Sequence, residues 1–400
     1  MENRHQTAAV VGGSIGGLTC ALLLERVGFQ VAVYERSSSE LDGRGGGIVL
    51  QPEMLRWFKE LSSQDPAQLA THSDFLRYLG PANSIEFEEP VEWRFSSWST
   101  LYRALLHDFG IDRYHLGSSV DRIEQTSEDV TLYFENGSHT TADLVVFADG
   151  ITSTGRRLLA PEAQPEYSGY IGWRGTVPET ELSAETMALI GDALGYCFVE
   201  DGHICMYPIP GPSGEIAIGD RLMNYVYYQN VPAGDPLTAI TTDIDGNTGA
   251  FSVPKGRVQS HWIAEMKEHA TQSLAPAAAE LVTSTDEPYI QVIFDVRVPT
   301  MTVGRVAVIG DAAFVARPHA AAGSAKVADD AWTLHDAFLQ DNADIPEVLK
   351  AWQVDRLDLG NQLIDRVSLM GRRAQFDHSW DPADINLRFG LKGGVTQPSY

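Results

Sequence analysis

The sequence predicts an α/β protein in which a discontinuous Rossmann-type dinucleotide-binding domain encloses an inserted, mostly antiparallel β-sheet and ends in C-terminal helices. Three observations predict this fold. A strand–turn–helix–strand unit opens the chain at residues 8–36, alternating apolar strands rich in Tyr and Trp fill residues 165–294, and the α/β pattern returns after residue 305. A chain of 400 residues has room for two or three domains, or for one large domain with an insertion.

Composition restricts the function classes. The net charge of −25 argues against nucleic acid or an anionic membrane surface as a partner, because both require a basic face. Three cysteines without C-x-x-C spacing indicate a reducing compartment, and no Cys/His cluster has metal-ligand spacing. The polar residues 1–7 do not resemble a signal peptide, and no apolar run has the length of a membrane span. We therefore expect a cytoplasmic protein that binds no metal; a homodimer is compatible with the sequence.

The first unit has the layout of a dinucleotide site. An apolar run from Ala8 to Val11 breaks at a glycine turn, a helix pattern follows, and a second apolar run ends on Glu35. Glu35 lies 18 residues beyond Gly17, the last glycine of the turn. Glycines let the backbone approach a pyrophosphate, the helix N-terminus offers free N–H groups, and a carboxylate accepts hydrogen bonds from ribose hydroxyls.

The turn departs from Gly-x-Gly-x-x-Gly at one position, because Ser14 stands where the second glycine belongs. Its hydroxyl could donate to a phosphate or cap the helix. A tight strand–helix connection without a ligand is the alternative interpretation of this turn. The turn does not identify the dinucleotide.

A glycine cluster at residues 43–47 precedes a short apolar strand, so the backbone here either lies against a flat group or forms a flexible surface loop. The pattern then predicts further elements in order. The helices are at 53–61, 101–109, about 261–281, about 324–339 and about 345–373. The strands lie within 77–95 and at 114–122 and 129–134, with a hairpin turn at 135–137, and the sheet strands are at 170–177, 196–208, 216–228 and 289–298.

Two more motifs stand at the ends of predicted strands: Ala148-Asp149-Gly150, followed by Arg156, and Gly310-Asp311, followed by Arg317-Pro318-His319. Nucleotide-binding segments on both sides of a sheet insertion predict a discontinuous cofactor domain, with the active site where the two parts meet. We assign residues 1–70, 98–164 and 295–400 to the cofactor domain with its C-terminal helices, and residues 71–97 and 165–294 to the substrate-binding sheet domain.

With its three motifs in this order, the chain resembles the class A flavoprotein monooxygenases, the para-hydroxybenzoate hydroxylase-like aromatic hydroxylases. The resemblance covers essentially the whole chain. Further segments narrow it to one branch of the family: Gly47 to Glu53, Trp93-Arg94-Phe95, Asp201-Gly202-His203, Tyr207 to Gly211, and Arg317 to Gly323.

The resemblance implies FAD as the cofactor and NADH or NADPH as the electron donor. Carried over by position, Ser14 with its neighbours Gly13 and Ile15 would hold the pyrophosphate, Glu35 the adenosine ribose, Arg36 the adenine end, and Asp311 the ribityl or pyrophosphate end. Asp149 with Arg156 matches a motif linked to FAD and the nicotinamide, and Leu50 and Gln51 fall where the family's loop meets the flavin ring.

The sequence also departs from the family pattern. Tyr102, with Arg103 beside it, takes the position of a frequent arginine and is the remaining cofactor-binding candidate. Phe314 replaces a usual histidine, and residues 320–325 replace a small-residue and Asn pattern. The helix that starts there is still expected to point its N-terminus at the flavin.

The implied reaction is aromatic hydroxylation. Reduced nicotinamide reduces FAD, O₂ adds to form a flavin C4a-hydroperoxide, and this oxygen attacks an electron-rich phenol or hydroxypyridine. His319, Tyr207 and His203 are the catalytic candidates; Arg174, Tyr225, Tyr227, Pro318 and again His319 are the substrate candidates. Packing of the tyrosines, a structural ion pair of Arg174 and a structural hydrogen bond of His319 are the alternatives.

Two other functions are compatible with the motifs. A tailoring hydroxylase would act on a larger pyridinol or phenolic natural product, and a non-catalytic sensor would bind FAD without turnover. A flavin-dependent halogenase should carry Trp-x-Trp-x-Ile-Pro, which this sequence does not contain.

Overall fold

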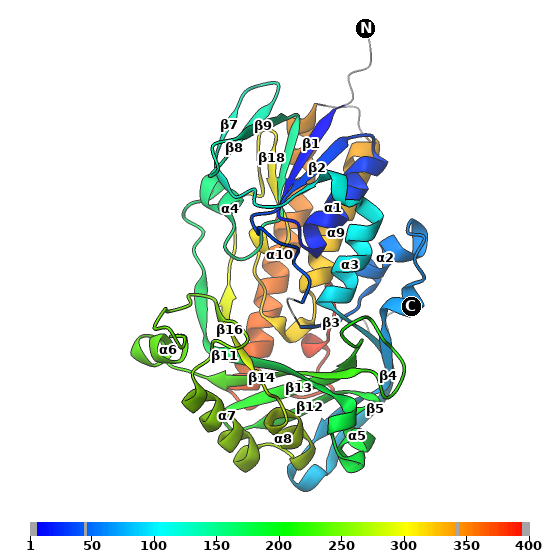
Figure 1. The fold of residues 1–400 in the computed structure, drawn as a ribbon, viewed down its shortest axis with the longest axis vertical. Coiled ribbons are helices and arrows are strands. Elements are labelled where there is room, and N and C mark those ends of the chain that lie inside the picture. Colours follow the sequence, from blue (N-terminus) through cyan, green and yellow to red (C-terminus); the bar gives the residue numbers. More distant parts are fainter. Residues whose placement is uncertain (1–5, 44–45, 341–343, 394–400) are drawn as a thin grey trace.

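The computed structural model describes residues 6–43, 46–340 and 344–393. Two residues of the glycine cluster, Arg44 and Gly45, lie outside this description. Within it, no helix is long and apolar enough to cross a membrane. The elements form two stacked parts joined by one long helix (Figure 1).

The first part is built on a six-stranded sheet with the order β17-β18-β10-β1-β2-β6. All neighbours are parallel except β17 and β18, which are antiparallel. Helices α1, α3 and α9 cover one face, and the three-stranded antiparallel sheet β7-β8-β9 lies on the other (Figure 1). The strands are β1 (Thr7–Val11), β2 (Gln30–Tyr34), β6 (Tyr114–His115), β7 (Val120–Gln125), β8 (Val130–Phe134), β9 (His139–Ala142), β10 (Leu144–Phe147), β17 (Thr302–Val303) and β18 (Val306–Val308), and the helices are α1 (Ile15–Arg26), α3 (Trp98–Phe109) and α9 (Gly323–Gln340).

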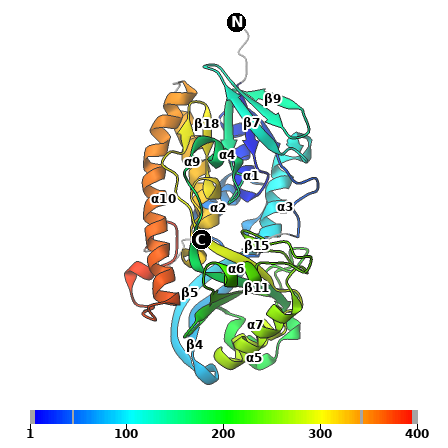
Figure 2. The same cartoon turned by 90° about the vertical axis from the view of Figure 1, so that its left-hand side faces the viewer.

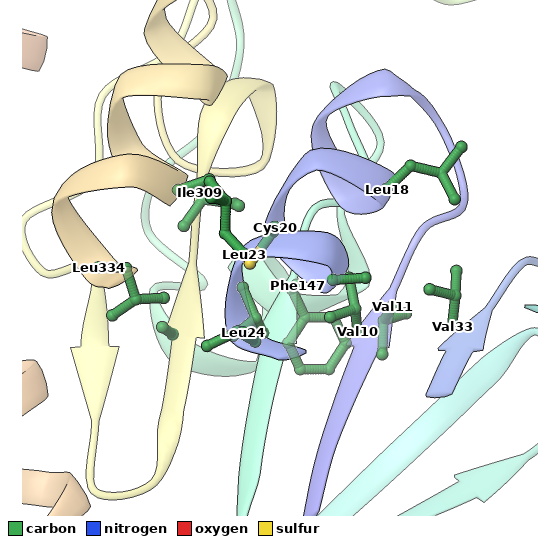
Figure 3. Packing of buried hydrophobic residues seen from close by; sticks show 14 of the residues in the cluster. Val10, Val11, Leu18, Cys20, Leu23, Leu24, Val33, Phe147, Ile309 and Leu334 are labelled. Atoms are coloured by element: carbon green, nitrogen blue, oxygen red, sulfur yellow. The ribbon is translucent and has the colours of Figure 1, made fainter. Parts of the chain in front are cut away.

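The core of this part lies between the parallel strands and α1. The central strands carry apolar residues on both faces, as expected where helices or a second sheet cover each side. Val10 on β1, Leu23 on α1 and Phe147 on β10 are fully buried and lie near one another (Figure 3). This packing fixes the carboxyl ends of β1, β2, β10 and β18 at one edge of the sheet, where the three predicted motifs follow the strands.

The second part is a nine-stranded sheet with the order β15-β16-β11-β14-β13-β12-β4-β5-β3. Helices α5, α7 and α8 cover its outer face, and its inner face is turned toward the first part (Figure 1). The strands are β3 (Gly47–Val49), β4 (Thr71–Leu79), β5 (Ile85–Ser97), β11 (Glu166–Pro178), β12 (Ala193–Val199), β13 (Gly202–Ile209), β14 (Leu222–Asn230), β15 (Ser252–Val253) and β16 (Tyr289–Asp295), and the helices are α5 (Ala184–Ile190), α6 (Asp235–Ile240), α7 (Ser260–Ser273) and α8 (Pro276–Thr283).

Helix α10 (Ile345–Gln375) runs along one side of the molecule beside both parts (Figure 2). It contacts β17 of the first part and β13 and β14 of the second. Two further helices, α2 (Pro52–Glu60) and α4 (Thr154–Leu159), follow β3 and β10.

The predicted fold class is confirmed. The single helix expected near residues 261–281 is two helices, because Pro276 supplies no N–H to continue α7 and instead occupies the first position of α8. The short helices α5 and α6 were not predicted. Strand β3 comes from the segment assigned to the cofactor domain, yet it forms the edge of the large sheet.

Candidate active site

The glycine turn after β1 is shaped by backbone contacts. Gly12 has φ +101°, and a Cβ there would lie 2.5 Å from the Ala148 carbonyl oxygen; a Cβ on Gly17 would collide with the Gly12 carbonyl. Ser14 caps α1 with an extended backbone, but its side chain makes no capping hydrogen bond. Its hydroxyl therefore remains available to a phosphate at the start of the helix.

Glu35, at the end of β2, holds this turn directly. One carboxylate oxygen accepts from the Gly13 N–H at 2.8 Å and the other accepts from the Ser37 N–H at 2.8 Å. Each oxygen keeps a second lone pair for a ribose hydroxyl. Arg36 is exposed and donates to the Thr152 hydroxyl at 2.9 Å, which links β2 to the segment after Asp149.

Tyr102 lies behind the glycine turn. Its side chain is fully buried, and its hydroxyl donates to the Tyr114 hydroxyl at 3.4 Å. The Tyr114 hydroxyl in turn donates to the Gly13 carbonyl at 2.9 Å. The Tyr102 hydroxyl is therefore connected to the turn through the Tyr114 hydroxyl, and it supports the backbone instead of facing a phosphate.

Arg156 joins the second and third motifs. Its guanidinium donates to the carbonyls of Asp311 at 3.2 Å and Ala312 at 3.1 Å, and also to the Ile151 carbonyl. Asp149 accepts from the Ser153 hydroxyl at 2.5 Å, so its carboxylate orders the turn that carries Arg156. These bonds bring together two motifs that are far apart in the sequence.

Asp311 has the properties of a ligand-facing carboxylate. Its side chain is exposed, yet desolvation raises its pKa, while Lys326 and Arg156 act in the opposite direction. An exposed carboxylate at the end of a strand can accept hydrogen bonds from the hydroxyl groups of a cofactor. Together with the free Ser14 hydroxyl and the spare lone pairs of Glu35, it gives the donor and acceptor set that FAD requires, so the residues present fit this cofactor.

Leu50 and Gln51 lie where β3 leads into α2. Leu50 is fully buried, and its N–H donates to the Arg94 carbonyl at 2.8 Å. The Gln51 carboxamide donates to the Ala321 carbonyl and accepts from the Leu391 N–H at 3.0 Å. Gln51 therefore brings the expected flavin loop next to the segment that begins α9.

The inner face of the large sheet carries the substrate candidates. Residues opposite each other in an antiparallel pair share a face. Arg174 on β11 pairs with Val226 and Tyr289, and the neighbouring pairs extend this face across β13 and β14. The residues on it include Arg174, His203, Cys205, Tyr207, Asn224, Val226, Tyr228, Tyr289 and Gln291.

The Arg174 guanidinium forms no ion pair with a carboxylate of the described residues. Its Nε donates to the Gln291 side chain at 2.7 Å, and none of the acidic side chains in the described residues lies within ion-pair distance. Desolvation lowers the pKa of Arg174, but the surrounding phenol and thiol groups of Tyr289, Tyr228 and others outweigh this effect and raise it. A charged, partly exposed guanidinium with unused donors is an acceptor site for an anionic oxygen.

His203 and His319 lie close together, with ring centroids 5.3 Å apart. Desolvation lowers the pKa of His203 to about 3, and desolvation, His203 and Arg317 hold the pKa of His319 well below its usual range. The His319 Nε2 is 2.6 Å from the Tyr170 hydroxyl, and Arg317 donates to that hydroxyl at 3.5 Å. Both imidazoles are therefore neutral at physiological pH, and each is a weaker base than an exposed histidine.

Tyr207 belongs to the inner face, where its ring stacks on Phe95 with centroids 4.6 Å apart. Burial raises its pKa, so its hydroxyl stays protonated. The Gly47 N–H donates to the Asn224 side chain at 2.9 Å, and a Cβ on Gly47 would lie 2.6 Å from the Tyr207 ring. Gly47, the last residue of the glycine cluster, thus lies directly against this part of the sheet.

Tyr225 and Tyr227 lie on the outer face. They pack in one apolar cluster with Trp173 and with α7 and α8, and the Tyr227 hydroxyl is 2.5 Å from His269 Nδ1. The structure therefore does not bring them together with Arg174. On β14, Asn224 and Tyr228 share the inner face with Arg174 and were not among the sequence candidates, because the pairing of β11 with β14 is needed to place them there. Pro318 precedes His319 in the short helical turn Pro318–Ala320.

Comparison with known proteins identifies the family. A family model described as FAD binding domain-like matches residues 167–295. The chain is 37% identical over 393 residues to 2,6-dihydroxypyridine 3-monooxygenase from Paenarthrobacter nicotinovorans, covering 98% of this chain and 97% of the relative. The chain belongs to the FAD-dependent aromatic hydroxylases. It is also 25% identical to 6-hydroxynicotinate 3-monooxygenase from Pseudomonas fluorescens, over 80% of each chain.

Among solved structures, 2,6-dihydroxypyridine-3-hydroxylase from Arthrobacter nicotinovorans has a TM-score of 0.92 and 34% identity, covering 99% of each chain. The predicted family, the FAD cofactor and the monooxygenase activity are thereby confirmed. This FAD-dependent aromatic hydroxylase uses NAD(P)H and O₂ to hydroxylate an aromatic ring.

Proposed function

We propose that this aromatic hydroxylase acts on a small hydroxylated pyridine or phenol and that the ring lies on the inner face of the large sheet. The observation that carries the proposal is Arg174, a guanidinium without a carboxylate partner among the described residues, surrounded by aromatic side chains. Similarity over nearly the full length to 2,6-dihydroxypyridine 3-monooxygenase supports a pyridinol. Residues 71–97 and 165–294, with β3 added at the edge, form the substrate part in this proposal; residues 1–70, 98–164 and 295–400 form the cofactor part.

The cofactor set we propose follows the three motifs. Gly13, Ser14 and Ile15 hold the pyrophosphate, Glu35 and Arg36 the adenosine end, Asp149 and Asp311 the remaining polar groups, and Leu50 and Gln51 border the flavin ring. Tyr102 acts behind the turn through Tyr114. When bound and reduced, FAD would activate O₂ for transfer of one oxygen atom to the ring; the protein's own residues would orient the ring, exclude water and move protons.

On the substrate side, Arg174 binds the acidic oxygen of the ring, and the Tyr207 hydroxyl, which stays protonated because burial raises its pKa, donates a hydrogen bond to it. His319 exchanges the proton of the ring hydroxyl, and the neutral imidazole of His203 lies beside it. Pro318 fixes the backbone before His319. Tyr225 and Tyr227 are not part of the proposed set, because they pack on the outer face.

The test is aerobic oxidation of NADH or NADPH by the FAD-loaded protein with 2,6-dihydroxypyridine. We expect ligand-stimulated donor oxidation with formation of a hydroxylated product. If no phenol or pyridinol in a panel stimulates either donor, the substrate proposal fails. Inclusion of long-chain pyridinols distinguishes a tailoring enzyme, and FAD binding without any turnover would indicate a sensor.

The cellular location we propose is the cytoplasm. Cys20, Cys197 and Cys205 are all buried and free, as expected for thiols in a reducing compartment. Burial raises the pKa of the Cys20 and Cys205 thiols to about 12, so neither is a reactive thiolate.

A further inference from the structure

The last part of the chain that the structure describes returns to the candidate active site. Within it, residues 387–391 form a segment that we call the C-terminal strap. The Gly390 N–H donates to the Ala320 carbonyl at 2.9 Å, and the Leu391 N–H donates to Gln51 Oε1 at 3.0 Å. The strap therefore bonds both the turn before α9 and the residue proposed to border the flavin ring.

The turn that the strap contacts, residues 318–321, carries His319 and leads into α9. Ala321 has φ +52°, a left-handed conformation that a residue with a side chain keeps only where its surroundings determine it. Its N–H donates to the Pro318 carbonyl at 2.8 Å, and its carbonyl accepts from the Gln51 carboxamide. Gln51 thus bonds the strap through its oxygen and the turn through its nitrogen.

Arg366 on α10 anchors the strap. Its Nη2 donates to the Gly390 carbonyl and, at 3.0 Å, to the Leu391 carbonyl. Gly393 has φ +70°, and a Cβ there would overlap with the Arg366 guanidinium, so the chain leaves room for this side chain. The two carbonyls that Arg366 holds belong to the same two residues whose N–H groups bond the turn and Gln51.

Packing alone does not require a charge at this place. Burial lowers the pKa of Arg366, and no carboxylate of the described residues opposes this effect. A charged group removed from water costs free energy unless it is paired. Leu387, Phe389 and Leu391 already bury their side chains in one apolar cluster, to which an apolar side chain at position 366 could add. What the guanidinium supplies is therefore the pair of directed bonds to the strap backbone.

We propose that Arg366 is a positioning residue, which fixes the backbone of the C-terminal strap and thereby sets the position of Gln51 and of the 318–321 turn beside the flavin ring. This inference rests on the proposed placement of Gln51 at the flavin and of His319 at the substrate. Hydrogen bonds from a charged donor are stronger than those between neutral groups. Without them, the peptide units of the strap would be free to turn, and the bonds to Ala320 and Gln51 would weaken.

The experiment compares Arg366→Met with Arg373→Met in the FAD-loaded full chain. Arg373 is also on α10 and is ion-paired with Asp384, just before the strap, so its replacement loosens the same end of the chain without removing a bond to Ala320 or Gln51. Each variant is measured for its FAD content and visible absorption spectrum, its urea midpoint, and its rate of hydroxylation of 2,6-dihydroxypyridine. The fraction of donor oxidation that yields hydroxylated product is measured in the same assay.

In Arg366→Met we expect FAD to stay bound with a shifted absorption band and a smaller fraction of donor oxidation that yields product. Hydroxylation should be about ten- to hundredfold slower, since displacement of a positioned group by roughly 1 Å can cost about a hundredfold in rate. Arg366→Lys keeps a charged donor in a different geometry, so it should show a smaller change in the same direction. Arg373→Met should keep the wild-type spectrum and product fraction even where its urea midpoint falls.

A wild-type spectrum and product fraction in Arg366→Met would overturn the role of Arg366, and so would the same changes in Arg373→Met. If Arg366→Met does not fold, Arg366→Lys decides by the same criterion: an unchanged spectrum and product fraction would refute the proposal. If the wild-type protein hydroxylates no phenol or pyridinol, the proposed function fails instead. The flavin spectra of the three variants then decide the role of Arg366 by themselves.

Discussion

Replacement of Arg174 by methionine should separate ligand binding from stability. The guanidinium gives its Nε hydrogen to Gln291 and has no carboxylate in the part of the chain that the structure describes. Loss of the guanidinium leaves the Gln291 side-chain oxygen without its donor, which is destabilising, but it also removes a desolvated charge, which is stabilising. The free energy of unfolding should therefore change by no more than about 1 kcal/mol. A hydrogen bond to a charged group contributes roughly 1.5–3 kcal/mol, so an anionic ring should bind about ten- to hundredfold more weakly.

Arg221→Met is the matched control. Arg221 is also on the large sheet side of the molecule, but its guanidinium is buried against Glu179, with a nitrogen–oxygen distance of 2.8 Å. Breaking a buried pair leaves an unpaired charge and should cost about 3–5 kcal/mol of stability. Ligand affinity should stay near the wild-type value in this variant, provided that it folds.

Two measurements on the oxidised, FAD-loaded protein decide the outcome: urea unfolding, and perturbation of the flavin absorption spectrum by 2,6-dihydroxypyridine. The predicted pattern is weak ligand binding with normal stability for Arg174→Met, and the reverse for Arg221→Met. If Arg174→Met loses as much stability as the control and binds the ring normally, Arg174 is a structural residue.

Three further variants test the remaining assignments. Asp311→Ala should lose FAD, measured by absorption of the purified protein; full FAD content would contradict its role. His319→Ala should retain FAD but slow hydroxylation or release hydrogen peroxide. If the fraction of donor oxidation that yields hydroxylated product is unchanged, His319 has only the structural role of its hydrogen bond to Tyr170. His203 is neutral in the folded protein down to about pH 3. In the unfolded chain the imidazole is protonated below about pH 6.5. As the pH is lowered from about 6.5 to about 3, His203 should therefore reduce the free energy of unfolding by about 1.4 kcal/mol per pH unit, and urea titrations of His203→Gln should lack this contribution.

The cofactor side of the fold could be predicted because its signals are local. A glycine turn, a strand-end acid and a helix start lie within one short segment, so spacing alone places Gly12 and Glu35 at the same sheet edge. The ends of β10 and β18 follow from the same rule for parallel strands. The hydroxyl chain from Tyr102 to Gly13 could not be predicted, because it depends on the distance between α3 and the turn.

The substrate side was harder because a strand has two faces. Alternation fixes which residues share a face, but not which face a helix covers. The aromatic character of Tyr225 and Tyr227 favours a substrate contact, whereas in the structure α7 and α8 cover their side of the sheet. Once Arg174 is placed inward, pairing selects Asn224 and Tyr228 instead.

Helix α10 has a consequence for how the ring reaches its site. It contacts β17 in one part of the molecule and β13 and β14 in the other, and its Gln375 bonds His203 at 2.7 Å. Near its end, a Cβ on Gly371 would lie 2.9 Å from His319 Nε2, so the helix lies directly against the His319 ring. A hinge motion that separated the two sheets would detach these contacts. We therefore expect the aromatic ring and the product to exchange without separation of the two sheets, so that the rate of exchange depends on loop residues more than on the contact between the two parts.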